Sequence, residues 1–526
     1  MATNIILEWG DGYLAVTPEV PDFLRNALRY WHRSLNREEG RAALVATGEY
    51  RELYSISGQI TPDNRFEQRL VTLPGFLCRI KNLLKGQGYD FAIVDKRTPA
   101  PTPDYAKAFE GLREYQCACA YAALASGGGI VACPTGWGKT HIIASIIKAY
   151  SSDELCMRNT PKVVVATPEQ DITRKDFNDL VTLLPDRDIG LVMTGAKHFS
   201  DDVQVITLQS LHLIDCNDIG IFIVDEVHTA ASEKRMETIM AARRALKWGV
   251  SATPSGRYDG RDLVTEGLFG PVVYQRTYAE GVNDGALVPI TVYWLRAPAP
   301  EHTRNLHHAT ALGLENYMKF KTRSGKYRNG LDRNDDYNQL VAELLRRIPT
   351  ELQTLCILQH LDHMDKLVHH CNDIKIMHAE ESSDNLAKNG YTHLVPVSKR
   401  ERKQAYEDMF SGACRKIIST YVYKQGVNFP QLTVVVNAGG GGSDIVARQI
   451  PGRESRNIGE VKPQAYLVDF VHEWDTVTDK NGRPRPGPIL KDDKSREKSY
   501  SDLGFTQVWV DTLDELPFLK DKNGPN

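Results

Sequence analysis

Five short apolar segments between residues 128 and 254 constrain the fold of this chain more than any other feature. Each is mostly aliphatic and ends in small or polar residues. Such segments are typical of parallel strands that are buried on both faces and carry working residues at their carboxyl ends. Because helical patterns separate them, residues 106–290 are predicted to form an α/β lobe. The segments are GGIVACP (128–134), KVVVATP (162–168), VQVITLQ (203–209), IGIFIVDE (219–226) and KWGVSATP (247–254).

A second set of short apolar segments predicts another parallel-sheet lobe at residues 346–475. Its expected strands are QTLCILQ (353–359), CRKIIST (414–420), LTVVVNAG (432–439) and QAYLVDFV (464–471). Residues 291–345 are more polar and irregular, which favours a basic, polar connecting region. Residues 476–526 are hydrophilic and turn-rich at their start, which favours a polar C-terminal extension.

The first 105 residues are predicted to form a small mixed α/β accessory unit. The stretch FLCRIKNLLKGQGYDFAIVD (76–95) has the pattern of an amphipathic helix, a glycine-containing turn and a strand. A proline-rich linker, KRTPAPTPDYAKAF, follows it. The expected fold class is therefore α/β, with two tandem parallel-sheet lobes behind a small N-terminal α/β domain.

Composition leaves the chain among ordinary soluble proteins. The 526 residues are 41% hydrophobic and 25% charged, with a formal net charge of −3. This balance excludes a basic footprint over the whole chain, but a nucleic-acid groove needs only local charge. No apolar run approaches the roughly 20 residues that cross a bilayer, and the N-terminus lacks a signal-peptide pattern. Nine scattered cysteines without a CxxC pair favour a reducing compartment, so a cytoplasmic protein is expected.

The stretch VACPTGWGKTH (131–141) has the form of a phosphate-binding loop between a strand and a helix. Gly136 and Gly138 would let the backbone N–H groups turn inward, and Lys139 would meet the β- and γ-phosphates. Thr140 would hold Mg²⁺. The strict pattern G-x-x-x-x-G-K-[ST] has glycine where this chain has Cys133. The alternative is a glycine-rich turn with an incidental lysine.

A pair of acids follows the predicted strand at 219–226. A nucleotide hydrolase needs a carboxylate to bind Mg²⁺, and Asp225 is the candidate for that role. It also needs a base to orient the attacking water, and Glu226 is the candidate for that role. An acidic pair at a strand end is commonplace by itself. Behind a phosphate loop, it predicts nucleotide hydrolysis.

The order PTGWGKT, DEVH and SATP resembles the superfamily-2 helicases of the DExH type, which tolerate a small residue at the first glycine position. The resemblance covers roughly residues 110–475 and implies two RecA-like lobes that use ATP and Mg²⁺. Arg113 and Gln116 resemble the adenine-recognition element, and Thr135 belongs to the phosphate loop. Gly426 and Asn428 resemble the ribose and phosphate sensor, although family members often carry aspartate at the second position. The segment QIPGRESR (449–456) resembles the arginine-finger motif through Gln449, Arg453 and Arg456.

The same resemblance implies contacts with a nucleic-acid strand and a coupling element. The strand-binding positions are Thr167, Pro168, Thr207, Gln209, Ser210 and Thr420. His228, Ser251 and Thr253 would couple hydrolysis to movement. The run YMKFKTRSGKYR (317–328) adds Lys319, Lys321 and Arg323 among aromatic residues. Such a run either follows phosphates while aromatic rings stack on bases, or is a solvated loop.

Within the superfamily, the chain resembles the phage UvsW-like DNA helicases and, beyond them, the XPB-like helicases. The resemblance rests on the accessory unit, the phrase LFGPVVYQRTYAEGVNDGALVP (268–289) and the ending AYLVDFVHEWDT. It implies remodelling of branched DNA during recombination, repair or replication: junction migration, fork regression, and unwinding of D-loops or R-loops. A monomer in the host-cell cytoplasm is expected.

Three alternatives remain open on the sequence alone. An RNA-directed helicase would use the same lobes, and the motifs do not read the 2′-hydroxyl. A translocase subunit of a restriction or defence complex would move on duplex DNA without separating its strands. A non-motor clamp that binds ATP as a switch would need neither Glu226 nor Arg456, so their presence argues against it.

Overall fold

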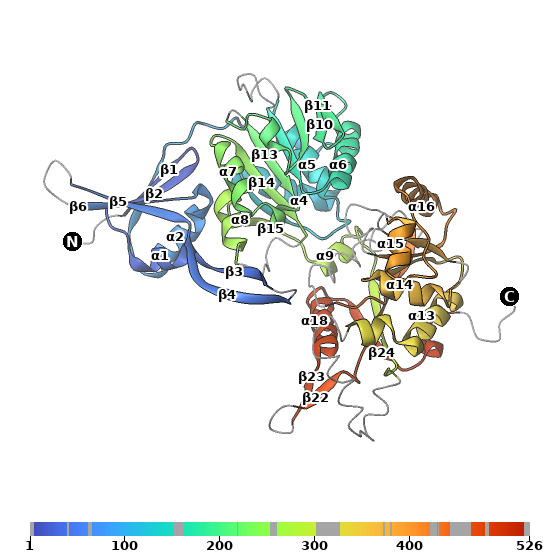
Figure 1. Cartoon of the computed structure of the whole chain (residues 1–526). Helices are drawn as coiled ribbons and strands as arrows, with labels where there is room; N and C mark the ends of the chain where they lie inside the picture. Colours follow the sequence, from blue (N-terminus) through green and yellow to red (C-terminus); the bar gives the residue numbers. More distant parts are fainter. Residues whose placement is uncertain are drawn as a thin grey trace. The chain divides into compact units, whose positions relative to one another are not determined.

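The computed structural model (Figure 1) resolves the chain into two compact units. The structure describes residues 5–38, 41–60, 66–151, 155, 162–217, 219–252, 260–300, 327–371, 374–378, 381–420, 429, 431–441, 464–478 and 483–519. The first unit spans Met1–Pro134 and Gly138–Arg276, and the second spans Thr135–Trp137 and Thr277–Asn526. None of the described helices is long and apolar enough to cross a membrane.

The accessory region is built on a five-stranded sheet in the order β5-β6-β2-β1-β7. Strand β1 pairs with β7 in parallel, and the other pairs are antiparallel. The helix, turn and strand expected at 76–95 are confirmed as α2 and β7. The elements are β1 (Ile5–Gly10), β2 (Tyr13–Thr17), α1 (Asp22–Ala27), β5 (Tyr54–Ile60), β6 (Phe66–Thr72), η1 (Pro74–Phe76), α2 (Leu77–Gly86) and β7 (Phe91–Asp95); β3 (Arg29–Glu38) and β4 (Arg41–Glu52) pair separately.

The first lobe has an eight-stranded sheet in the order β11-β10-β12-β9-β13-β14-β8-β15, in which only β11 is antiparallel. All five predicted strands are present and almost wholly buried, which explains their unbroken apolar runs. The strands are β8 (Gly129–Ala132), β9 (Val163–Thr167), β10 (Ile189–Met193), β11 (Ala196–His198), β12 (Val203–Thr207), β13 (Ile221–Asp225), β14 (Leu246–Ser251) and β15 (Val272–Gln275).

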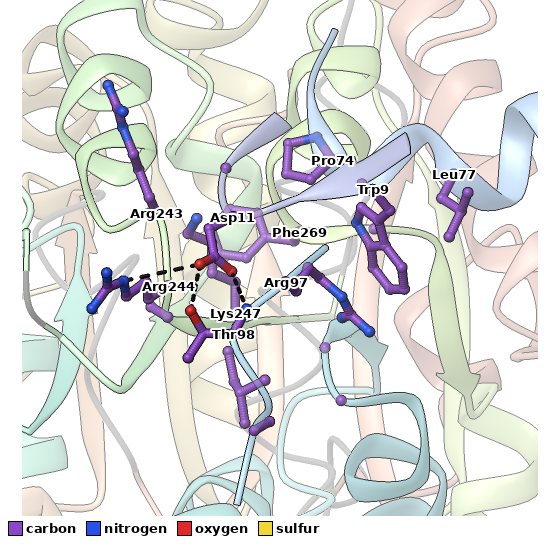
Figure 2. Close-up of a pocket in the computed structure, with 18 of the residues that line it drawn as sticks. Trp9, Asp11, Pro74, Leu77, Arg97, Thr98, Arg243, Arg244, Lys247 and Phe269 are labelled. Atoms are coloured by element: carbon purple, nitrogen blue, oxygen red, sulfur yellow. Dashed lines mark hydrogen bonds and ion pairs between the residues drawn. The ribbon is translucent and has the colours of Figure 1, made fainter. Parts of the chain in front are cut away.

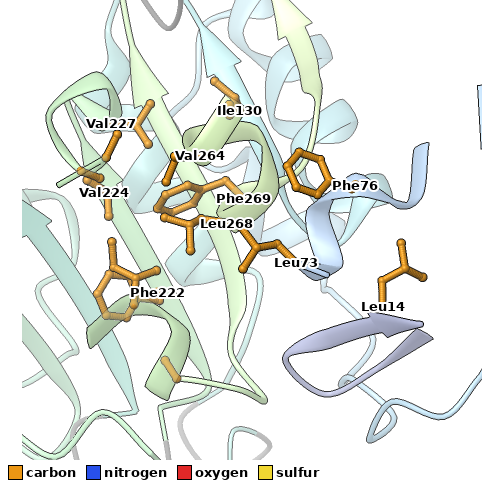
Figure 3. Close-up of a cluster of buried hydrophobic side chains, with 14 of the residues drawn as sticks. Leu14, Leu73, Phe76, Ile130, Phe222, Val224, Val227, Val264, Leu268 and Phe269 are labelled. Carbon is orange, nitrogen blue, oxygen red and sulfur yellow. The ribbon is translucent and has the colours of Figure 1, made fainter. Parts of the chain in front are cut away.

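The first lobe also contains helical segments. They are α3 (Tyr105–Phe109), α4 (Glu114–Ser126), α5 (Lys139–Lys148), α6 (Gln170–Leu183), η2 (Leu211–Leu213), η3 (Val227–Thr229), α7 (Glu233–Ala241) and α8 (Asp262–Phe269). One hydrophobic core runs through both sheets, and Figure 3 shows Leu73 and Phe76 of the accessory region beside Leu268 and Phe269 of α8. The accessory region is therefore packed onto the first lobe as part of the same unit.

Close backbone approach fixes this junction. A Cβ atom at Gly75 would lie 2.2 Å from the carbonyl oxygen of Glu266, so only glycine fits at that position. Beside it, the Arg79 guanidinium makes a bidentate ion pair with the Glu266 carboxylate, with contacts of 2.9 and 2.5 Å. Such fork-like pairs combine energy with a fixed geometry.

The second lobe contains a seven-stranded parallel sheet in the order β18-β19-β17-β20-β21-β16-β24. The four predicted strands are confirmed as β17 (Gln353–Leu358), β19 (Lys416–Thr420), β20 (Leu432–Asn437) and β21 (Ala465–Val471). Its other elements are α9 (Tyr278–Asn283), β16 (Ile290–Arg296), η5 (Arg328–Asp332), α13 (Asp335–Arg347), α14 (Leu361–Val368), β18 (Lys375–Met377), α15 (Ser383–Lys388), α16 (Lys399–Ser411), β22 (Thr476–Thr478), β23 (Pro484–Pro486), α18 (Pro488–Asp502), β24 (Thr506–Val510) and η9 (Leu513–Glu515).

Two predicted boundaries differ from the structure. Strand β16 lies within the expected connecting region, and α18 and β24 lie within the expected polar extension, yet all three belong to the second unit. Three charged residues of α18 are buried, namely Asp492, Asp493 and Arg496. The Arg496 guanidinium donates to both carboxylate oxygens of Asp469, each at 2.9 Å. A hydropathy pattern shows that these residues are charged, but it does not show the partners that allow them to be buried.

The junction between η1 and α8 gives a stability prediction. Gly75→Ala should lower the free energy of unfolding by about 1–3 kcal/mol, because the new methyl group meets backbone atoms that cannot turn away. Gly86→Ala is the matched control at the end of α2, where a Cβ atom would meet nothing within 4 Å. Denaturant unfolding measures both, and equal effects of the two substitutions would contradict the packing argument.

Candidate functional site

The phosphate loop expected at residues 131–141 connects β8 to α5. Its backbone is left-handed at Gly136 (φ 89°) and Gly138 (φ 104°), where a side chain would be strained. A Cβ atom at position 138 would also lie 2.2 Å from the amide nitrogen of Gln116. Lys139 and Thr140 begin α5, where the helix N-terminus favours a bound anion.

Cys133 occupies the position of the missing first glycine, and the thiol is buried in the lobe. It contacts Cys119 on α4: a hydrogen bond between the two thiols, together with burial, raises the pKa of Cys119. The side chain at 133 therefore packs into the interior, which explains why this loop accommodates a residue larger than glycine.

Two acids are buried close to each other at the carboxyl edge of the first sheet. Asp225 ends β13 and is only 8% exposed, and its Oδ1 has no hydrogen-bond partner among the described residues. Burial, followed by the charges of Asp176 and Glu226, raises the pKa of Asp225 well above its usual value. Burial also raises the pKa of Asp176, on α6, to about 6. The carboxylates at this edge carry more negative charge than the nearby ammonium groups of Lys139 and Lys175 neutralise.

A divalent cation fits that charge distribution. Asp225 supplies an unsatisfied carboxylate oxygen, and Thr140 supplies a hydroxyl at the start of α5. In the part of the chain that the structure describes, no group of three or more histidine, cysteine or acidic side chains could hold a metal. An ion at this edge would thus take further ligands from phosphate and water, as Mg²⁺ ordinarily does.

Glu226 belongs to a network of four side chains. It is the one residue other than glycine with positive φ (50°) among the described residues, a conformation that costs free energy. Its Oε2 accepts a hydrogen bond from the Ser251 hydroxyl at 3.1 Å, and its Oε1 lies 3.8 Å from the Lys139 ammonium. The Nδ1 atom of His228 lies 3.0 Å from the Ser251 hydroxyl oxygen. The structure thus brings together Lys139, Glu226, Ser251 and His228.

Gln116 lies behind the phosphate loop, at the start of α4. It is 3% exposed, and its side-chain oxygen accepts a hydrogen bond from the backbone N–H of Arg113 at 3.0 Å. The Arg113 guanidinium donates to the Tyr115 hydroxyl at 3.1 Å. The side-chain amide of Gln116 therefore caps the start of α4 and lies close to Gly138 of the phosphate loop. Its recognition of adenine stays a prediction.

A hydrogen bond joins the loops after β9 and β12. These loops are expected to hold a nucleic-acid strand. Gln209 is exposed and donates from Nε2 to the Pro168 carbonyl oxygen at 2.9 Å. The Thr207 hydroxyl donates to Ser210 Oγ at 2.8 Å. The prediction differs from the structure at Thr167, which is fully buried and hydrogen-bonded to Thr173. Its hydroxyl supports the junction of strand and helix and is not presented to a ligand.

Several predicted positions lie outside the described residues: Thr253, Lys319, Lys321, Arg323, Gly426, Asn428, Gln449, Arg453 and Arg456. Thr420 is described, and it is half-buried at the end of β19. Thr135 is half-buried in the phosphate loop. The contributions of the second lobe to the site therefore stay predictions.

Asp176 is the site residue that the sequence analysis missed, together with its neighbour Lys175. The Lys175 ammonium lies 3.5 Å from Asp176 Oδ1 and 2.9 Å from Asp179 Oδ2. A signal was available, because Asp176 occurs four residues after Ile172 and four before Leu180, on the buried face of α6. An acid on a buried helical face needs a specific reason to be there.

Comparison with known proteins agrees with this geometry. Residues 110–256, which hold the phosphate loop, the acidic pair and the Ser251 segment, match the family model described as "Type III restriction enzyme, res subunit". The DNA 3′-5′ translocase XPB2 of Sulfurisphaera tokodaii is 23% identical over 381 residues, which is 68% of this chain and 81% of the relative. The DNA 3′-5′ helicase XPB of Mycobacterium tuberculosis is 30% identical over 270 residues, 49% of this chain and 44% of the relative.

Among solved structures, T4 UvsW aligns over 97% of this chain and all of its own, with a TM-score of 0.39 and 18% identity. The family match and the XPB relatives cover the segment in which the motifs occur in the expected order. These findings support the resemblance to the superfamily-2 helicases, and over this segment the chain is similar to the XPB helicases.

Proposed function

We propose that the chain is an ATP-driven motor on DNA that remodels or unwinds branched DNA. The observation that carries the ATPase assignment is the network around Glu226, which places a strained carboxylate beside the phosphate-loop lysine. The names of the XPB relatives support DNA as the track and 3′-5′ movement. The UvsW-like sequence features support branched substrates, such as replication forks, four-way junctions, D-loops and R-loops.

Binding of ATP begins with an exchange of partners at Lys139. Without nucleotide, its ammonium lies 3.8 Å from the Glu226 carboxylate in a site that is largely closed to water. The β- and γ-phosphates carry more negative charge than one carboxylate and approach the same ammonium group. Lys139 therefore turns to the phosphates, which frees Glu226 to act as a base.

Asp225 and Thr140 would hold Mg²⁺, which when bound would neutralise charge on the phosphates. Glu226 orients the attacking water and accepts its proton. Arg113, Gln116, Thr135, Gly426 and Asn428 complete the nucleotide contacts, and Gln449, Arg453 and Arg456 supply the contacts of the second lobe. Arginines in such positions stabilise charge in the transition state.

Ser251 and His228 connect hydrolysis to movement. The Ser251 hydroxyl donates to Glu226, so it responds directly to the partner exchange. Ser251 also ends β14 and leads into Thr253, which the resemblance assigns to coupling. The loops joined through Gln209 and Pro168 lie at the same carboxyl edge and follow β12 and β9. These loops, with Thr420 and the basic run at 317–328, hold the DNA strand.

A second candidate function is translocation on duplex DNA without strand separation. The family match over residues 110–256 favours it, because its description names a restriction enzyme subunit. Such a protein would share the ATP site and would need a partner chain. Strand separation, not ATP hydrolysis, distinguishes the two functions.

Glu226→Gln tests the catalytic assignment. The substitution keeps the size of the side chain and one oxygen that can accept the Ser251 hydrogen bond, but it removes the base, so ATPase turnover should fall by about 10²–10⁴-fold. Binding of ATP should persist, because Lys139 remains and loses a competing carboxylate. Glu237→Gln, on the exposed face of α7, is the control and should keep full turnover. Turnover within a few-fold of the unmodified protein would reject Glu226 as the base and revive the ATP-switched clamp.

Asp176→Asn tests the electrostatics of the metal edge. Asp225 must be ionised to hold Mg²⁺, and Asp176 is one of the charges that raise its pKa. Removing that charge lowers the pKa of Asp225, so the acidic limb of the pH–rate profile should move to lower pH. Steady-state ATPase rates from pH 5 to 9 measure the shift. Asp186→Asn, on an exposed turn, should leave the limb in place; an unmoved limb in Asp176→Asn would contradict the coupling.

A nucleic-acid panel tests the substrate. ATPase rates are measured without nucleic acid, and with single-stranded DNA, duplex DNA, a fork, a four-way junction and matched RNA. Forks and junctions should stimulate most, and labelled strands should separate with ATP in the unmodified protein but not in Glu226→Gln. Stimulation by duplex DNA without separation would favour the restriction-type translocase. Stimulation by RNA alone would replace DNA as the track.

A further inference from the structure

A cavity of about 520 Å³ lies at the amino edge of the first sheet, the edge opposite the phosphate loop. Its wall includes Gly128, Gly220 and Lys247, which precede or begin β8, β13 and β14. The accessory region closes it with the β1–β2 turn at Trp9–Gly12 and with the linker after β7. Figure 2 shows Asp11 and Thr98 from that side facing Arg244 and Lys247 from the lobe. Cavities of this size hold small ligands.

Positive charge lines this cavity in excess. The charged residues that line it are four cations (Arg97, Arg243, Arg244 and Lys247) and two acids (Asp11 and Asp95), and the Arg243 side chain extends away from Asp11 (Figure 2). Both acids are already engaged. Arg97 binds Asp95 in a bidentate pair at 2.9 and 2.7 Å, and Asp11 accepts two hydrogen bonds from Thr98 and lies 3.9 Å from Arg244.

Two of the cations remain without a partner. Lys247 is 9% exposed, and its ammonium makes no ion pair or hydrogen bond within the described part of the chain. The same holds for Arg243, which is exposed at the cavity and packs against Gly12. Burial lowers the pKa of Lys247 to about 8, and the charge of Asp11 opposes that shift. At neutral pH the amine is thus mostly protonated, although a buried charge without a partner is costly.

We propose that this cavity is a second ligand site, separate from the ATP site, that binds a phosphate monoester such as a nucleoside monophosphate or the 5′-phosphate of a nucleic-acid strand. A phosphate monoester carries close to two negative charges at neutral pH, which matches the two unpaired cations. Lysine supplies a point charge and arginine a planar fork, the combination that recognises phosphate oxygens. The site does not depend on the proposed motor activity.

Titration calorimetry with thymidine 5′-monophosphate tests this site in the full chain. The experiment uses a Lys139→Ala background, which disables the phosphate loop. Binding should persist there, and Lys247→Met and Arg243→Gln should each weaken it by about 10-fold or more. Lys162→Met is the matched control, because Lys162 directly precedes β9 at the same edge of the sheet but does not line the cavity. Arg243 lies on the surface, so its substitution tests the site without disturbing a buried strand.

Two further arms separate the sources of phosphate. Thymidine without phosphate should not bind, and a 5′-phosphorylated oligonucleotide should bind more tightly than its 5′-hydroxyl counterpart if strand ends are the source. Affinity for thymidine 5′-monophosphate should fall from pH 7 to 9 as Lys247 loses its proton, and this fall should vanish in Lys247→Met. The other charged groups at the cavity are Asp11, Asp95, Arg97, Arg243 and Arg244.

Three results would overturn the proposal. The first is loss of all binding on Lys139→Ala alone, which would place the nucleotide in the phosphate loop. The second is unchanged affinity in both Lys247→Met and Arg243→Gln. The third is equal binding of thymidine and thymidine 5′-monophosphate, which would show that the phosphate monoester is not what the cavity recognises.

Discussion

Negative charge buried at the carboxyl edge of the first sheet is the constraint around which the catalytic half of the protein is organised. Asp225 and Asp176 are removed from water; burial raises the pKa of both, and the charge of Asp176 raises the pKa of Asp225 further. Such an arrangement opposes folding unless something offsets it. Here the offsetting groups are few: Lys175 lies 3.5 Å from Asp176, and Lys139 lies 3.8 Å from Glu226. The site is thus built to be completed by a cation and a phosphate chain.

That cost is tolerated because the frame around the site is rigid. Strands β8, β9, β13 and β14 are almost entirely buried, and α8 joins their core to the accessory region through Gly75 and the Arg79–Glu266 pair. A strained residue such as Glu226 persists only when its surroundings determine its conformation. Ser251 and His228 do so from the next strand and the following turn, so the base is positioned before any ligand arrives.

The second lobe uses buried charge for a different purpose. Arg496, Asp469 and Asp493 are almost fully buried and satisfy one another, and Arg496 also donates to the Gly441 carbonyl oxygen at 2.6 Å. Buried ion pairs of this kind contribute little net stability, but losing one partner is costly. Their consequence is positional. They fix α18 against β21 and against Gly441, which follows β20. The polar C-terminal sequence is therefore part of the lobe.

The features of this protein that can be predicted from the sequence are those encoded by residues close together in the chain. The buried parallel strands, the phosphate loop and the Ser251–His228–Glu226 grouping are predictable, because hydropathy runs and motif spacing are local properties. Helix α18 was missed because its charges find partners far along the chain. Asp176 was missed although its position on the buried face of α6 is a local signal. Thr167 was assigned to a ligand contact although its hydroxyl is used inside the lobe. Where a polar side chain makes its contacts depends on the tertiary structure.

Strand β14 connects the two charged edges of the first sheet. Ser251 ends the strand beside Glu226, and Lys247 lies four residues earlier on the same face, about 13 Å away along the strand. The strand is buried and hydrogen-bonded to β13 on one side and β8 on the other, so it cannot shift at one edge alone. Coupling between the carboxyl edge and the amino-edge cavity would pass through a displacement of this strand. Linkage then requires that each ligand change the affinity for the other by the same factor.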